Sequence, residues 1–207
     1  PALKGDQVIQ IGTTVHKYGE TNCSFKSVIT LGTCDDIDGV EVQECKTEKE
    51  VIVKWCRLLH DIDPDIITGY NILGFDFDYL YQRAQELKCE KYLLECGRIQ
   101  DKRSQFKEKT LASSALGDNI LKYVEMEGRV IIDMMKYVQR EYKLDSYKLD
   151  NVASSFINGK IKKIENNHIF IDNVVGLNIG DYIKIDSIKH KITDIDYQEK
   201  KITIDRK

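Results

Sequence analysis

The stretch of sequence that decides the fold is DPDIITGYNILGFDFDYLYQRA, residues 63–84. Its β-branched run Ile66-Ile67-Thr68 is typical of a short buried strand. Gly69 and Gly74 follow, and glycine lets the backbone turn sharply or approach another group closely. Apolar residues then recur at helical spacing, which predicts a helix with one buried stripe formed by Leu80, Ala84 and Leu87. The stretch therefore predicts a strand, a turn and a helix in succession.

Three chemically distinctive side chains lie at the corner between this strand and this helix. Asn71, Phe75 and Asp76 follow the carboxyl end of the strand. Ligands of α/β sheets bind at that edge. Taken alone, Asp76 is better explained as a helix cap. The position predicts a binding site, and the residue types leave its chemistry open.

The string Gly-Tyr-Asn-Ile-x-x-Phe-Asp-x-x-Tyr-Leu-x-x-Arg-Ala, residues 69–84, resembles the second exonuclease motif of the family B DNA polymerases. It is most similar to the delta-like polymerases of eukaryotes and large DNA viruses. In that family the aspartate binds a catalytic metal, and the asparagine and phenylalanine touch the 3′ end of DNA. The resemblance implies that Asp76 is the catalytic metal ligand for Mg²⁺ or Mn²⁺. It also implies DNA contacts by Asn71, Phe75 and the adjacent Tyr70.

Further segments extend the resemblance over about residues 5–157. They are a strand that contains Val8, a Gly-Arg-Val-x-x-Asp string that ends at Asp133, and a Ser-Tyr-x-Leu segment from Ser146. Asp133 is either a helix N-cap or a further acidic group near the site, and we favour the cap. The family's first acidic motif, Asp-x-Glu, and its third acidic motif have no match here. We expect both to lie outside these 207 residues.

The length of 207 residues suits either one sizeable domain or one domain with a small appendage. The net charge of −3 disfavours a protein that holds duplex DNA by charge alone, and it is compatible with a site for metal cations. No apolar run is long enough for a membrane span, so no membrane partner is expected. The chain starts at Pro1 without a signal-peptide pattern. We therefore expect a piece of a longer intracellular protein that acts in the nucleus or at a viral replication site.

The six cysteines form no Cys-x-x-Cys pair. Zinc sites usually contain such closely spaced ligands, so a zinc site is disfavoured. Without a secretory signal, free thiols in a reducing compartment are the better interpretation.

The predicted fold class is α/β: a ribonuclease H-like mixed sheet flanked by helices, with a small C-terminal β-rich, barrel-like appendage. We expect residues 1–158 to form the exonuclease-like domain, with a helix that opens at the capping box Thr47-Glu48-Lys49-Glu50 and buries Trp55. Residues 159–207 show short alternating strands separated by turns. This tail is barely basic, with ten Lys/Arg against eight Asp/Glu, so a spacer or protein-contact role is as plausible as nucleic-acid binding.

The segment 91–114 is basic, and one aromatic residue, Phe106, lies among its basic residues between Arg98 and Lys109. It is either a solvated loop, which we slightly favour, or a surface that guides single-stranded DNA by neutralising phosphates.

The predicted function is that of a proofreading 3′→5′ exonuclease domain, part of a DNA-directed DNA polymerase, which hydrolyses the terminal phosphodiester by two-metal catalysis. One carboxylate cannot hold two ions, so the isolated chain is expected to be inactive. Expected partners are DNA, the rest of the polymerase and replication accessory proteins. One alternative is a non-catalytic, exonuclease-like scaffold or single-stranded-DNA guide. Another is a separate ribonuclease H-like exonuclease without a polymerase.

Overall fold

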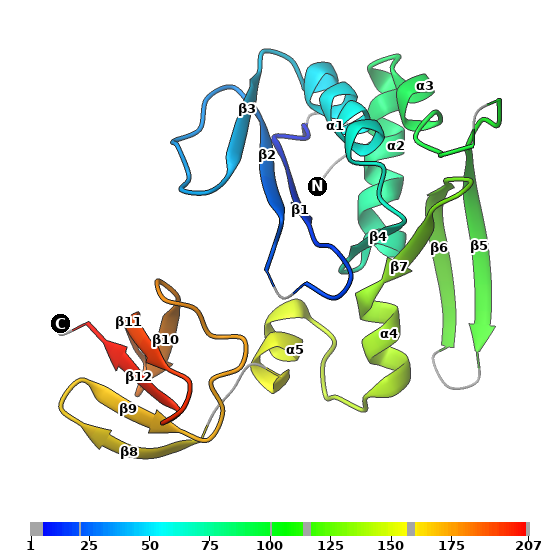
Figure 1. The fold of residues 1–207 in the computed structure, drawn as a ribbon. Coiled ribbons are helices and arrows are strands. Elements are labelled where there is room, and N and C mark those ends of the chain that lie inside the picture. Colours follow the sequence, from blue (N-terminus) through cyan, green and yellow to red (C-terminus); the bar gives the residue numbers. More distant parts are fainter. Residues whose placement is uncertain (1–5, 21, 100, 114–116, 157–159, 206–207) are drawn as a thin grey trace. The chain divides into compact units, whose positions relative to one another are not determined.

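The computed structural model describes residues 6–20, 22–99, 101–113, 117–156 and 160–205, without the side chains of 111–113 and 117–119 (Figure 1). The chain separates into two compact units, Pro1–Lys143 and Leu144–Lys207. Each unit has its own cluster of buried apolar side chains. The domain boundary expected at residue 158 stays a prediction.

The first unit begins with a three-stranded sheet of β1 (Gln10–Val15), β2 (Phe25–Leu31) and β3 (Glu41–Cys45). β1 runs antiparallel to β2, and β3 runs parallel to β2. In the described residues β1 pairs only with β2, so its other edge carries no strand.

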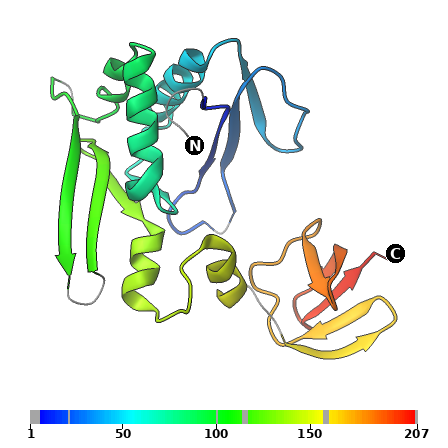
Figure 2. The same cartoon turned by 180° about the vertical axis from the view of Figure 1, so that it is seen from behind.

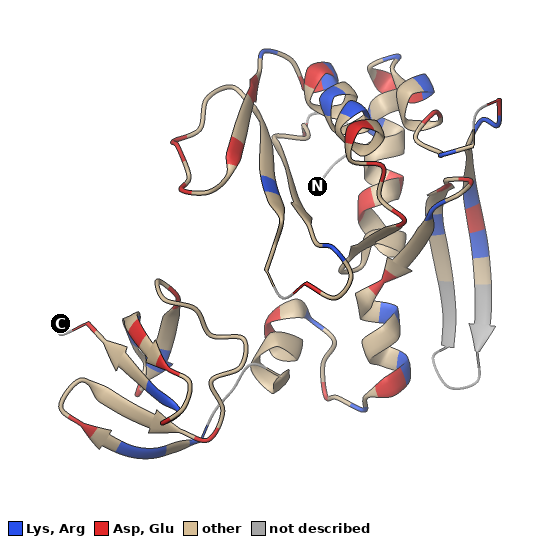
Figure 3. Cartoon of the chain, viewed as in Figure 1, with Lys and Arg blue, Asp and Glu red and all other residues tan. Residues whose placement is uncertain are grey.

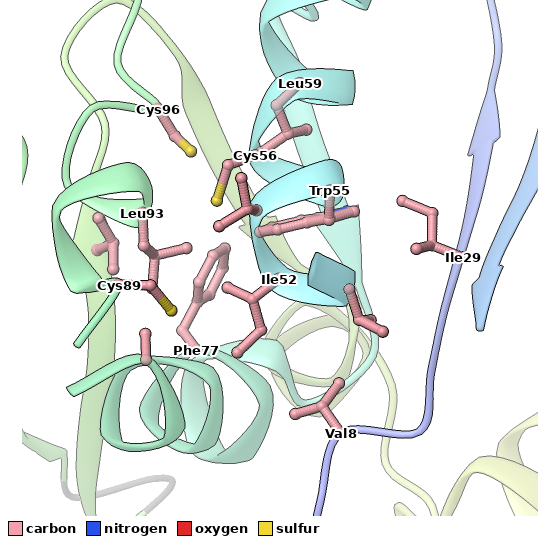
Figure 4. Close-up of a cluster of buried hydrophobic side chains, with 14 of the residues drawn as sticks. Val8, Ile29, Ile52, Trp55, Cys56, Leu59, Phe77, Cys89, Leu93 and Cys96 are labelled. Carbon is pink, nitrogen blue, oxygen red and sulfur yellow. The ribbon is translucent and has the colours of Figure 1, made fainter. Parts of the chain in front are cut away.

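Helix α1 (Glu48–Ile62) follows and packs on the sheet. Thr47 accepts a hydrogen bond from the Glu50 amide, and the Glu50 carboxylate accepts one from the Thr47 amide. The predicted capping box is therefore confirmed. Trp55 is 7% exposed and belongs to the core, also as predicted. Figure 4 shows Trp55, Ile52 and Leu59 of α1 among the buried side chains.

The central stretch forms β4 (Ile66–Gly69), then a π-helix, η1 (Ile72–Asp76), and then α2 (Phe77–Glu86). The predicted strand and helix are confirmed, but the prediction that the strand is buried is wrong, because Ile66 is 53% exposed and no residue of β4 is fully buried. The π-helix between them was not predicted. Single π-helical turns are rare in proteins, and those that occur are often found at functional sites.

The chain continues through α3 (Glu90–Leu93), β5 (Gln105–Ser113), β6 (Gly117–Glu125), β7 (Val130–Asp133) and α4 (Met134–Glu141). The favoured interpretation of 91–114 as a loop is wrong for its second half, because β5 pairs antiparallel with β6 in a long hairpin. In both Figure 1 and Figure 2, α2 stands between the β1–β3 sheet and this hairpin. The rings of Tyr81 and Phe106 stack with centroids 4.2 Å apart and join α2 to the hairpin.

β7 pairs with β4 in parallel, and Gly69 lies opposite Asp133 in the register. The mixture of helices with parallel and antiparallel strands confirms the α/β class. The described strands of this unit form three separate small sheets, so the ribonuclease H-like arrangement stays a prediction.

The second unit contains α5 (Leu149–Phe156) and five strands in the order β10-β11-β12-β9-β8. The strands are β8 (Ile161–Glu165), β9 (His168–Ile171), β10 (Tyr182–Ile185), β11 (Ile188–Asp196) and β12 (Lys201–Ile204). Every pairing is antiparallel. The β-rich appendage is confirmed, as an open sheet whose end strands β8 and β10 pair with no further strand in the described residues.

The six cysteines are free thiols, four of them buried. Cys56, Cys89 and Cys96 lie in one part of the first core, where Figure 4 shows the sulfur atoms of Cys56 and Cys96 side by side. Within the described segments, no helix combines the length and the apolar character that a bilayer span requires.

Candidate active site

The corner between β4 and α2 is a tight backbone turn. Asn71 adopts the left-handed conformation, with φ 62° and ψ 22°. Its carbonyl oxygen accepts hydrogen bonds from the amides of Gly74 and Phe75, both at 3.0 Å. A Cβ atom on Gly74 would lie 2.4 Å from Asn71 Oδ1, so a larger residue at this position would require the Asn71 side chain to move.

A side chain distant in sequence holds this turn. Asp133 Oδ1 accepts from the Asn71 amide at 2.9 Å, and Oδ2 accepts from the Leu73 amide at 3.0 Å. Oδ1 also accepts from the Met135 amide at 2.9 Å, which confirms the predicted N-cap of α4. Asp133 is 4% exposed. The sequence predicted the cap but not the two contacts of Asp133 with the turn. The available signal for these contacts was that β4 ends at a glycine, Gly69, and β7 ends at a polar residue, Asp133.

Asp76 is the last residue of the π-helix and precedes α2, and its side chain makes no capping hydrogen bond. It lines a cavity of about 730 Å³ together with Phe75. Residues 7–16 and 66–69 form two sides of this cavity, and Trp55 and Leu59 of α1 also line it. Asp78, two residues on, is bonded to Gln82 and Lys122 instead.

Burial raises the pKa of the Asp76 carboxyl above its ordinary value, and the negative charge of Asp133 raises it further. The residue as a whole is nevertheless exposed to solvent. Burial and the Asp133 charge also raise the pKa of Tyr70. A cation beside Asp76 would oppose these effects by favouring the charged carboxylate.

Phe75 exposes 42% of its surface and lines the same cavity. Its ring stacks on Tyr79 at a centroid distance of 5.5 Å. The Tyr79 hydroxyl in turn donates to the Asp6 carbonyl oxygen at 3.0 Å. An exposed ring with a fixed partner is suited to stacking on a nucleic-acid base.

The four predicted site residues thus lie within one corner, with Asp76 and Phe75 at the cavity and Asn71 and half-buried Tyr70 just before them. Their roles stay predictions. In the part of the chain that the structure describes, no three His, Cys, Asp or Glu side chains are grouped to hold a metal. Asp133 already accepts three hydrogen bonds from backbone amides. Asp76 therefore fits as one oxygen ligand of a metal site, and the residues of the corner do not supply the other ligands.

The hairpin does not present a purely basic surface. Acidic and basic residues alternate along β5 in Figure 3. Lys107 pairs with Glu125 at 2.9 Å, and Lys122 pairs with Asp78 at 3.2 Å. These pairs reduce the charge available for phosphates, and the strand-guiding role stays a prediction.

Comparison with known proteins places the corner in a family context. The model of the exonuclease domain of DNA polymerase family B matches residues 1–152. A DNA polymerase of Pyramimonas orientalis virus is 64% identical over 187 residues, which are 90% of this chain and 16% of that protein. The DNA polymerase delta catalytic subunit of Glycine max is 41% identical over 157 residues, 76% of this chain and 14% of that subunit.

A DNA polymerase of Phaeocystis pouchetii virus is 35% identical over 92% of this chain and 20% of its own length. The chain therefore spans only 14% to 20% of these three relatives. The Pyramimonas orientalis virus alignment covers 90% of this chain, which is more than the first unit contains, so it extends into the C-terminal unit.

Proposed function

The chain belongs to the exonuclease-domain family of the family B DNA polymerases, and on that premise we propose that it is part of a proofreading 3′→5′ exonuclease within a DNA-directed DNA polymerase. The observation that carries the proposal is the corner itself. The matched region brings a partly buried carboxylate, Asp76, and an exposed aromatic ring, Phe75, to one cavity beside a strand end.

Each residue has a defined task in this proposal. Asp76 would supply one carboxylate to a Mg²⁺ or Mn²⁺ site, and ions held there would supply the means to activate a water and to stabilise the charge on the leaving 3′ oxygen. Phe75 stacks on the terminal base and keeps it beside Asp76. The side-chain amide of Asn71 and the hydroxyl of Tyr70 bind polar groups of the last nucleotide.

The proposal also concerns what the 207 residues do alone. Two metal ions need several carboxylates, and the described residues offer one at the cavity. The remaining ligands then come from other segments of the polymerase, and the isolated chain does not hydrolyse DNA. The partners are DNA, the rest of the polymerase and replication accessory proteins, in the nucleus or at a viral replication site.

The test uses the complete polymerase with a labelled primer that carries a 3′ mismatch, in the presence of Mg²⁺. Asp76→Ala is expected to lower the excision rate at least about 100-fold, because it removes a metal ligand, while primer extension is retained. Asp78→Ala is the matched control, since Asp78 bonds to Gln82 and Lys122 and not to the corner. Excision at the normal rate by the Asp76→Ala polymerase would refute the proposal.

A second candidate function is a non-catalytic guide for single-stranded DNA. The single carboxylate at the cavity favours it, because the described residues contain no metal cluster. This candidate predicts no excision by the unmodified polymerase under any metal. It also predicts that Phe75→Ala weakens binding of a single-stranded oligonucleotide while Asp76→Ala does not.

A further inference from the structure

Asp133 lies where the paired strands β4 and β7 both end. Gly69, the last residue of β4, lies opposite Asp133, the last residue of β7, in a parallel pair. The chain leaves β4 immediately into the corner. A carboxylate at the end of β7 therefore faces the first amides beyond β4, 62 and 60 residues away in sequence.

The corner depends on an outside acceptor for two of its amides. The Asn71 and Leu73 amides donate to the two oxygens of Asp133 at 2.9 and 3.0 Å. These amides lie before or within the first turn of the π-helix, where no earlier helical carbonyl is available. Bonds to a charged carboxylate are stronger than bonds between neutral groups.

The conformation held in this way is an uncommon one. Asn71 has positive φ, and a π-helical turn follows it. Both are conformations that persist where the surroundings enforce them. The Asn71 carbonyl oxygen accepts a hydrogen bond from the Phe75 amide at 3.0 Å. The position of Asn71 therefore constrains the position of Phe75 and of Asp76 next to it.

We propose that Asp133 is a positioning residue for the active site, which fixes the orientation of Phe75 and Asp76 through the backbone of the Asn71–Leu73 turn. This inference rests on the proposed exonuclease function for its catalytic consequence. Its structural part, the order of the turn, stands independently. Asp133 holds the turn through hydrogen bonds to three backbone amides, so its effect on the position of Phe75 and Asp76 runs through the backbone.

The cap and the turn contacts can be separated by substitution. Serine is a good N-cap, so Asp133→Ser retains an oxygen for the Met135 amide. Its single short hydroxyl cannot replace the two carboxylate oxygens that serve Asn71 and Leu73. Asp133→Asn keeps the size of the side chain and one acceptor oxygen, but its amide group is a donor facing a donor.

The experiment measures excision, primer extension and hydrogen exchange in the complete polymerase for Asp133→Ser, Asp133→Asn and Asp76→Ala. For Asp133→Ser we expect excision to fall at least about tenfold, in kcat more than in KM, with a higher Mg²⁺ requirement and normal extension. Exchange should accelerate in peptides that cover residues 69–76 and stay slow in peptides from α4. Asp133→Asn should show the same pattern to a smaller degree.

Three outcomes overturn the inference. Normal excision and exchange in Asp133→Ser would mean that Asp133 is only a cap. Lost excision with unchanged exchange at residues 69–76 would mean that Asp133 acts directly on metal or DNA. Accelerated exchange throughout α4 in both variants would mean that the cap is its main role. If Asp76→Ala excises normally, the proposed function fails, and the exchange data still decide whether Asp133 holds the turn.

Discussion

The Asp76 carboxyl is in a position that disfavours its own charge. Burial and the neighbouring Asp133 charge raise its pKa. An acid whose pKa is higher in the folded state than in the unfolded state stabilises the fold when protonated. That contribution is lost as the pH rises through the raised pKa. At neutral pH the charged Asp76 therefore destabilises the metal-free chain.

We accordingly expect Asp76→Asn to raise the melting temperature at neutral pH without divalent metal. The gain should shrink as the pH falls below the raised pKa, because the wild-type carboxyl is then protonated and resembles the amide. Thermal unfolding of both proteins over a series of pH values measures this. Asp78→Asn is the control: its carboxylate pairs with Lys122, so it should lower the melting temperature or leave it unchanged. A destabilised Asp76→Asn chain at neutral pH would contradict the argument.

Two strand glycines differ in the space around them. A Cβ on Gly69 would lie 2.5 Å from Cγ2 of Ile72, whereas a Cβ on Gly12 would meet nothing within 4 Å. Ile72 is β-branched and packs against the core, so it has little freedom to move away. We expect Gly69→Ala to destabilise the first unit by about 1–3 kcal/mol through overpacking. Gly12→Ala should be near neutral, and urea unfolding of the two variants tests the contrast.

At the scale of elements, two arginines meet at the turn that leads from α1 into β4. Arg129 and Arg98 both bond Asp63 Oδ1 at 2.8 Å. The Arg129 side chain is 1% exposed, and the Arg98 side chain is 33% exposed. Arg129 also donates to backbone carbonyls of Pro64 and Cys96, so it connects the end of α1, the start of β4 and the loop before β5.

Replacement of Arg129 should therefore matter much more than replacement of Arg98. Arg129→Met leaves buried carbonyl groups without donors, and we expect a loss of roughly 3 kcal/mol in the free energy of unfolding. Arg98→Met removes only partly exposed contacts and should change stability far less. Denaturant unfolding of both variants gives the comparison. Equal losses of unfolding free energy in the two variants would show that burial does not make the hydrogen bonds of Arg129 more stabilising than those of Arg98.

At the scale of the whole molecule, the chain holds two separate cores. The sole tryptophan, Trp55, belongs to the first. Ile169, Ile192 and Ile202 of the second are each 1% exposed. Among the described residues, no side chain belongs to both clusters of buried apolar residues. The two units therefore have separate sources of stability.

We expect Ile202→Ala to destabilise the C-terminal unit by about 2–5 kcal/mol, because it opens a cavity in a small core. Trp55 fluorescence, which reports on the first unit, should keep its urea midpoint, while circular dichroism should show an earlier transition for the β-rich unit. Thr203→Ala, at the neighbouring and less buried position, is the control. A shifted fluorescence midpoint in Ile202→Ala would show that the units unfold together.

Much of this protein was accessible from the sequence alone, where the interactions are short-range. The capping box joins residues three apart, and the strand, turn and helix of 63–84 follow from local preference and periodicity. The same local pattern carried the family resemblance, which the family model over 1–152 confirms. The location of Asp76 at a strand-to-helix corner was predicted in this way.

The tertiary structure decided what depends on contacts between distant segments. The local sequence of the basic segment 91–114 favours a loop, because the strand that pairs with its second half, as β5, lies beyond the segment in sequence. Asp133 was identified as a cap because that contact is local, whereas its bonds to Asn71 and Leu73 require the parallel pairing of β4 with β7. Hydrogen bonds within a turn are encoded by neighbours in the chain, but a carboxylate that reaches across 62 residues is placed only by the fold.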